Sequence, residues 1–161
     1  MHSLRTFATS SMLPLVALVS GCGSSGPIPA TPLSGTIDGA AWTAKSGTVR
    51  KGFGGDNRRS IEISAGEIEC GSFSDPPTPT VLTSVDWTAG LAKDFSLSFS
   101  DVESSQTATF YLGGGKNVIA TDGRIEIIEA PTEKGSKGKI RLRATAESSE
   151  IEGEITLSVC D

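Results

Sequence analysis

Histidine is almost absent from this sequence, whose 161 residues contain a single one, His2. Ser-His-Asp and Cys-His nucleophilic sites need histidine as their base. Histidine is also the usual general acid–base residue and the commonest ligand for zinc and copper. If residue 2 lies outside the folded domain, all these kinds of site are excluded. We expect no cofactor and no metal site.

Long hydrophobic runs are also absent. The most apolar stretch, Met12–Val19, is much shorter than the roughly 20 residues that a membrane-spanning helix needs. The residues before it include Arg5 and no acidic side chain. A basic start followed by a short apolar core is typical of a signal peptide. We therefore expect residues 1–21, His2 included, to be removed on export.

The apolar run ends in Val19-Ser20-Gly21-Cys22, which resembles the bacterial lipobox of a branched residue, two small residues and cysteine. The resemblance implies that Cys22 becomes the lipidated first residue of the mature chain, which lipid then holds at a membrane. Gly23 follows the cysteine in place of the aspartate that favours inner-membrane retention, so we expect the outer membrane, on its periplasmic or surface side. The alternative is a plain secreted protein.

Positive charge is scarce, because 14 Lys and Arg face 19 Asp and Glu for a formal charge of −5. The leader carries one arginine and no acid, so its removal leaves −6. Nucleic acid is thereby disfavoured as a partner. The cluster of Arg50, Lys51, Arg58 and Arg59 could contact an anionic partner, but a solvated hairpin loop is the preferred interpretation.

Cysteine is limited to three positions, and lipidation of Cys22 would leave Cys70 and Cys160. Exported chains meet an oxidising compartment, where a remaining pair usually forms a disulfide. Such a bond would close a loop of about ninety residues and stabilise the domain by roughly 4 kcal/mol in the chain-entropy account.

No stretch has helical periodicity, whereas short runs of alternating polarity recur between Gly, Asp, Asn, Ser and Pro. Residues 22–33 are rich in Gly, Ser and Pro and are expected to form a flexible tether, and residues 34–161 a single domain. We predict an all-β, antiparallel, jelly-roll-like β-sandwich of about eight to ten short strands. The runs that carry this prediction are 60–64, 67–70, 81–87, 94–99, 107–112, 124–128, 139–146 and 151–160.

The last two runs predict a hairpin. If Ser148 and Ser149 form its turn, Ile140 faces Leu157 on the dry side, and Arg143 faces Glu154 on the wet side.

Large amphipathic aromatic side chains are few, namely Trp42, Trp87 and Tyr111. Rings of this kind can stack on sugars when they line one face of a sheet, and the alternation places Tyr111 outward. The alternative is that the tryptophans are core residues.

The domain opens with Gly35-x-Ile37-Asp38-Gly39-x-x-Trp42 and closes with the strand "IEGEITLSVC". These segments resemble a loose group of secreted bacterial lipoproteins of unknown function. The resemblance implies a β-sandwich and a lipoprotein context, and no functional residue can be transferred from it.

Carboxylates recur as Glu67 and Glu69, as Glu126 and Glu129, and as Glu150, Glu152 and Glu154. Paired carboxylates can hydrolyse glycosides, but the wet faces of strands alternate in the same way. We expect a non-enzymatic, lipid-anchored envelope protein with a binding or scaffolding role toward an envelope protein or a glycan. A carbohydrate-binding module is the alternative, and a carboxylate-dependent hydrolase is the third hypothesis.

Overall fold

The computed structural model describes residues 26–71, 77–95 and 106–161. Cys22, most of the predicted 94–99 strand and its core residues Leu97 and Phe99 lie outside these ranges. Eleven strands and no helix are present in the described residues, which therefore include no helix able to cross a membrane. The strands are β1 (Ser34–Ile37), β2 (Ala40–Thr43), β3 (Ser46–Lys51), β4 (Arg58–Ser64), β5 (Thr80–Asp86), β6 (Ala92–Asp94), β7 (Ala108–Tyr111), β8 (Asn117–Ile119), β9 (Asp122–Glu129), β10 (Lys137–Ala146) and β11 (Ser149–Val159).

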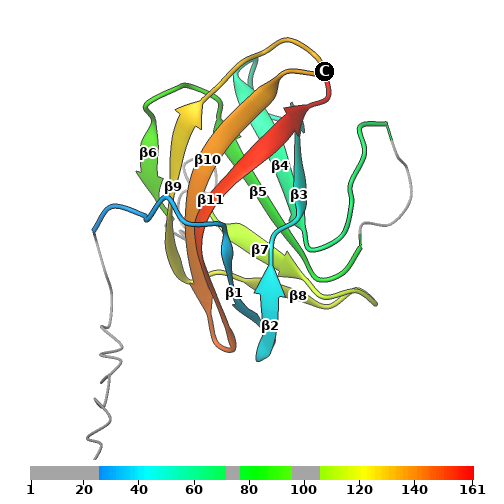
Figure 1. Cartoon of the computed structure of the whole chain (residues 1–161), viewed down its shortest axis with the longest axis vertical. Coiled ribbons are helices and arrows are strands. Elements are labelled where there is room, and N and C mark those ends of the chain that lie inside the picture. The colour runs from blue at the N-terminus through cyan, green and yellow to red at the C-terminus, as the bar shows by residue number, and fades with distance from the viewer. Residues whose placement is uncertain (1–25, 72–76, 96–105) are drawn as a thin grey trace, which may run out of the picture.

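The strands pair into one curled sheet in the order β6-β9-β10-β11-β3-β4-β5-β7-β8, with β1 and β2 attached beside β11 (Figure 1). The prediction of an all-β domain is confirmed. The prediction of purely antiparallel pairing is wrong, because β11 runs parallel to β3. The described strands also do not divide into two separate sheets. The curl instead brings two walls of one sheet face to face, β6-β9-β10-β11 and β3-β4-β5-β7-β8.

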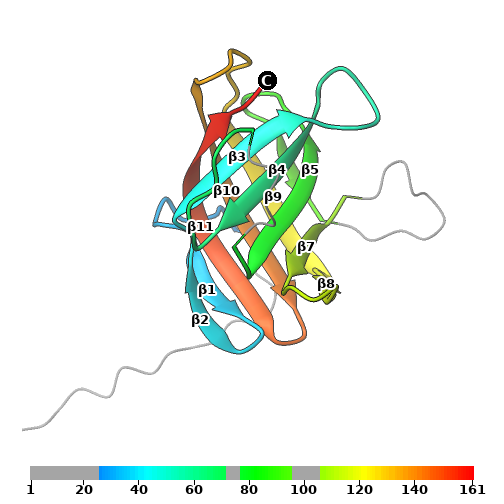
Figure 2. The same ribbon diagram turned by 90° about the vertical axis from the view of Figure 1, so that its right-hand side faces the viewer.

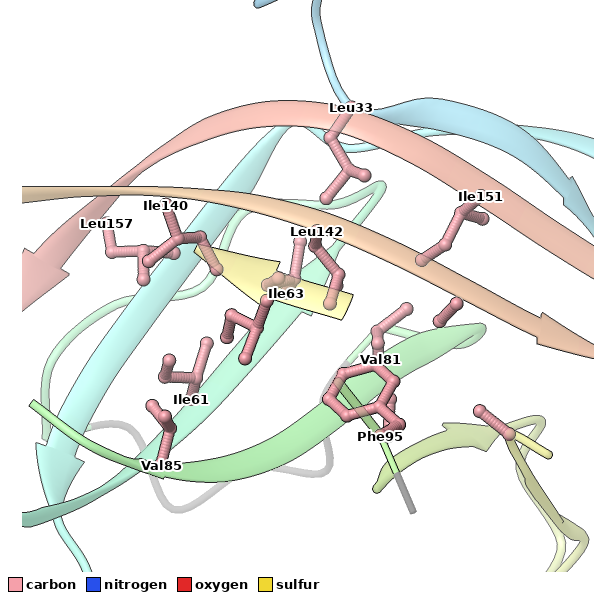
Figure 3. Packing of buried hydrophobic residues seen from close by; sticks show 14 of the residues in the cluster. Leu33, Ile61, Ile63, Val81, Val85, Phe95, Ile140, Leu142, Ile151 and Leu157 are labelled. Carbon is pink, nitrogen blue, oxygen red and sulfur yellow. The ribbon is translucent and has the colours of Figure 1, made fainter. Parts of the chain in front are cut away.

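The core fills the space between these two walls. Alternate residues of each strand point inward, since successive side chains leave a strand on opposite faces. Ile140, Leu142 and Leu157 project from one wall towards Ile61 and Ile63 on the other (Figure 3). All five are at most 1% exposed. The inward faces predicted for the runs 60–64, 139–146 and 151–160 are confirmed.

Local turn chemistry explains the first hairpin. Asp38 and Gly39 have φ values of 52° and 76°, the left-handed pair that a two-residue turn between antiparallel strands requires. Ile37 pairs with Ala40 across this turn.

The predicted register of the last hairpin is wrong by two residues. The turn residues are Glu147 and Ser148, so that Ile140 pairs with Ile155 and Arg143 with Glu152. A shift of two keeps every side chain on its face, which is why the buried positions were still correct. Ser149 is free to act elsewhere, and its buried Oγ accepts the Asp38 N–H at 3.0 Å.

Residues 26–33, the larger part of the predicted tether, belong to the fold. The Leu33 N–H donates to Glu154 O at 2.9 Å, and the Glu154 N–H donates to Thr31 O at 2.7 Å. Ile28 and Leu33 are each 1% exposed. Figure 1 shows this segment crossing in front of β9 and β10 before it reaches β11. We call residues 26–33 the strap.

Residues 67–70 are not a strand, in contrast to the prediction. They belong to the connection that follows β4, which the disulfide between Cys70 and Cys160 fixes to the end of β11. The predicted pairing of these two cysteines is confirmed.

A substitution at Gly153 tests the contact between the strap and β11. Its φ is +139°, and a Cβ there would lie 2.6 Å from Thr31 O and 2.7 Å from Leu33 Cα. Gly153→Ala should therefore lower the free energy of unfolding by more than about 2 kcal/mol, measured by urea denaturation followed through tryptophan fluorescence.

Gly135→Ala is the matched control, because Gly135 also has positive φ (+84°) but nothing within 4 Å of the added Cβ. It should cost about 1 kcal/mol from backbone strain alone. Equal destabilisation by the two substitutions would show that the strap does not pack against Gly153.

Candidate functional site

A groove of about 410 Å³ lies on the outer face of β3, β4, β5 and β7. This face of the β3-β4-β5 wall is turned towards the viewer in Figure 2. Strand register arranges the side chains of the groove floor in two rows that cross the four strands. The first row is Thr48, Glu62, Leu82 and Thr109, and the second is Arg50, Ser60 and Ser84, with Thr107 directly before β7.

A loop of residues 65–71, which follows β4, lies beside the groove at β3. Ser46 Oγ donates to Gly66 O at 2.6 Å and accepts the Ile68 N–H at 2.8 Å, and Arg50 Nη2 makes a long 3.5 Å hydrogen bond to Glu69 O. Ser46 and Arg50 flank Thr48 on the same face of β3. The loop therefore passes over Thr48, which explains why this outward-facing residue is only 1% exposed.

Two polar atoms in the groove are buried without a partner. Thr48 Oγ1 and Arg50 Nε are both enclosed and make no hydrogen bond within the described part of the chain. A buried polar group without a hydrogen bond costs about 1–3 kcal/mol, so such groups are rare and call for an explanation. Both atoms belong to residues that line the groove. A ligand bound there could supply the missing partners.

The opposite end of the groove is held by side-chain hydrogen bonds. Arg58 Nε donates to Ser84 Oγ at 2.9 Å, and Thr107 Oγ1 donates to Ala120 O at 2.9 Å. The prediction of a solvated hairpin loop is therefore wrong for Arg50 and Arg58, which hold defined positions at the groove. Arg50 and Glu62 carry the opposite charges of its lining.

The structure separates the three predicted stacking residues. Trp42 is 4% exposed and donates from Nε1 to Pro79 O at 3.2 Å, and Trp87 is 2% exposed and donates to Pro131 O at 2.8 Å. Both rings lie in the core cluster, so neither presents a face to a sugar. Tyr111 is partly exposed on β7, two residues from Thr109 on the same outer face.

The disulfide fixes the position of the loop that covers Thr48. Cys70 lies in this loop directly after Glu69, and its bond to Cys160 joins the loop to the residue that follows β11, the strand beside β3. Lys45 and Glu67 add an exposed ion pair at 3.2 Å on the same loop.

Most of the acidic residues considered for hydrolysis form ion pairs on the outer face of the other wall. Arg141 Nε lies 3.0 Å from Glu154, Lys139 lies 3.4 Å from Glu129, and Arg143 pairs with Glu152. Arg124 hydrogen bonds to Asp94 and to Glu126, which raises the pKa of its guanidinium above the ordinary value. These contacts hold the strands of this wall together.

No group of three or more His, Cys, Asp or Glu side chains is arranged to hold a metal ion in residues 26–71, 77–95 and 106–161.

Sequence reasoning did not identify the groove. Its members alternate along each strand, as in Thr48 and Arg50 on β3 or Ser60 and Glu62 on β4. A solvated strand face has the same pattern. The distinguishing observation is the burial of Thr48 under the loop, which depends on contacts between distant segments.

The chain matches no known family profile, no curated protein and no solved structure.

Replacing the groove threonine provides a direct test of its unpaired hydroxyl. Thr48→Val exchanges an unsatisfied buried O–H for a methyl group of similar shape. The free energy of unfolding without ligand should therefore stay the same or rise.

Thr80→Val is the matched control on the same face. Thr80 is fully buried, but its Oγ1 donates to Pro77 O at 2.7 Å, so its loss should cost about 1 kcal/mol or more. Urea denaturation of both variants makes the comparison, and a Thr48→Val loss as large as that of Thr80→Val would contradict the unpaired state of Thr48.

Proposed function

We propose that this chain is a lipid-anchored, non-enzymatic binding protein of the bacterial cell envelope, and that it takes its ligand in the outer groove of β3, β4, β5 and β7. The observation that carries the proposal is the pair of buried, unpartnered atoms, Thr48 Oγ1 and Arg50 Nε, in one groove. Their burial lowers the stability of the free domain, and binding would recover that free energy.

The strap supports an anchor that holds the domain close to the membrane. Gly26 O accepts a hydrogen bond from Arg143 Nη1 at 3.2 Å, and only residues 23–25 separate Gly26 from Cys22. Four residue steps of extended chain span at most about 14 Å. A lipid on Cys22 would therefore keep the strap near the bilayer surface, in place of the flexible tether of residues 22–33 expected from composition.

The strap and the groove belong to different walls of the sheet. The strap crosses the outside of the β9-β10-β11 wall (Figure 1). The groove lies on the outside of the β3-β4-β5-β7 wall, which is turned towards the viewer in Figure 2. In the proposed arrangement, the anchored wall faces the lipid and the groove faces the envelope space.

Scaffolding through a sheet edge or an apolar patch has less support. The strands at the ends of the main strand order, β6 and β8, have three residues each, and β2, which pairs only with β1, has four. Short edges are poor templates for strand addition. The large exposed apolar residues of the described part are Phe53, Ile119 and Ile128, which lie in the β3–β4 loop, on β8 and on β9.

Anchoring is tested by expressing the full-length chain in a Gram-negative host supplied with alkyne-labelled palmitate. The wild-type protein should incorporate the label, lose residues 1–21 and sediment with membranes. Cys22→Ser should abolish labelling and leave the leader uncleaved, because the cysteine is both lipid acceptor and cleavage site.

Cys70→Ser is the matched control, since it removes a different cysteine. It should be labelled as strongly as the wild type, although less stable. Cleavage of wild-type protein at another position without label would favour the plain secreted protein.

A further inference from the structure

We infer that the ligand of the outer groove is a short, uncharged saccharide, bound edge-on by Thr48, Arg50 and Glu62 and not by stacking on the tryptophans. This inference rests on the groove of the proposed function and names the chemical class that it takes.

The charges of the groove point to a neutral ligand. Arg50 and Glu62 are the charged residues of its lining, and their opposite charges give the lining no net charge. A phosphate or polyanion would meet Glu62, and a cation would meet Arg50, so either charge alone is disfavoured. A ligand with many groups that both donate and accept hydrogen bonds satisfies both residues at once.

Hydroxyl groups have this property. One sugar hydroxyl can accept from Arg50 Nε while its neighbour donates to the Glu62 carboxylate. Glu62 is partly exposed and makes no ion pair among the described residues. Thr48 pairs with Glu62 across β3 and β4, so the unpaired Oγ1 and the carboxylate are neighbours in the first row. The three side chains thus offer a donor, an acceptor and a group that can do either.

The dimensions of the groove suit an elongated molecule. The distance from β3 to β7 covers three strand spacings, about 14 Å, and the two rows are about 7 Å apart. Its volume of about 410 Å³ is within the range of ligand pockets, about 300–1,000 Å³. Leu82 forms an apolar patch in the middle of the first row, where the C–H face of a sugar ring could rest.

Tyr111 lies next to the Thr109 end of the first row on the same outer face. A saccharide that extends beyond β7 would meet its ring. Of the three aromatic residues suggested by the sequence, Tyr111 is therefore the one that remains compatible with sugar binding.

The experiment uses the full-length, membrane-extracted protein in a sugar-free detergent such as lauryldimethylamine oxide, since maltoside detergents would compete. Isothermal titration calorimetry would compare four neutral trisaccharides, namely cellotriose, maltotriose, mannotriose and triacetylchitotriose, with trigalacturonate, trialanine and inorganic phosphate. At least one neutral trisaccharide should bind with a Kd below about 1 mM, and the last three probes should bind more weakly.

The groove variants are Thr48→Val, Arg50→Gln and Glu62→Gln. Each should weaken binding by about fivefold or more, as expected for the loss of one buried hydrogen bond. Thr156→Val and Glu147→Gln repeat the threonine and glutamate changes at exposed positions outside the groove, and they should leave the Kd unchanged. Thr48→Val is the decisive variant, because it is expected to fold at least as stably as the wild type.

The outcomes separate this inference from the proposed function. If trialanine, trigalacturonate or phosphate is the best ligand and responds to the groove variants, the groove binds but the neutral saccharide is wrong. If a trisaccharide binds but ignores all three groove variants, the inference is also overturned. If no probe binds, both the saccharide and the binding role of the groove lose their support. Anchoring at Cys22 is then decided separately, by the palmitate-labelling experiment.

Discussion

The rest of the structure depends on the edge of β11 that faces away from β10. Three segments share this edge: β1 pairs with residues 150–152, the strap bonds to Glu154, and β3 runs parallel to Ser158 and Val159. The β3 contact joins the two walls into one sheet. Because it involves only the end of β11, the walls can diverge from there and enclose the core.

This junction also places the two proposed functional features on opposite walls. The strap uses the middle of the β11 edge and so lies on the β9-β10-β11 side, next to Arg143. The disulfide uses the end of the same strand and fixes the loop that covers Thr48 on the β3 side. A single strand therefore positions both the strap and the loop that covers Thr48.

Much of the fold was predictable because alternation is a local signal. It placed Ile140, Leu142 and Leu157 correctly in the core, and Asp38-Gly39 specified its turn through the φ values it favours. Alternation has a period of two and cannot distinguish registers that differ by two, so the Glu147-Ser148 turn was missed. The parallel β3–β11 pair and the docked strap depend on contacts between distant segments, which have no local pattern.

The candidate site was less predictable than the fold. Trp42 and Trp87 were candidate sugar-stacking residues because of their residue type alone, but small domains use such large side chains to fill the core. Thr48 is unremarkable in sequence and became informative only through the loop that buries it. The flexible tether predicted from composition is also wrong for residues 26–33. The buried side chains of Ile28 and Leu33 dock a segment that is otherwise typical of a linker.

The central claim, that β11 binds the strap as part of the fold, is tested most directly by native-state hydrogen exchange on the full-length protein. The account predicts that the Leu33 amide, which donates to Glu154 O, exchanges within about tenfold of the rate of the core Leu142 amide. Rapid exchange at Leu33, close to that of the exposed Gly54 amide, would show that residues 26–33 are a free tether and would contradict the account.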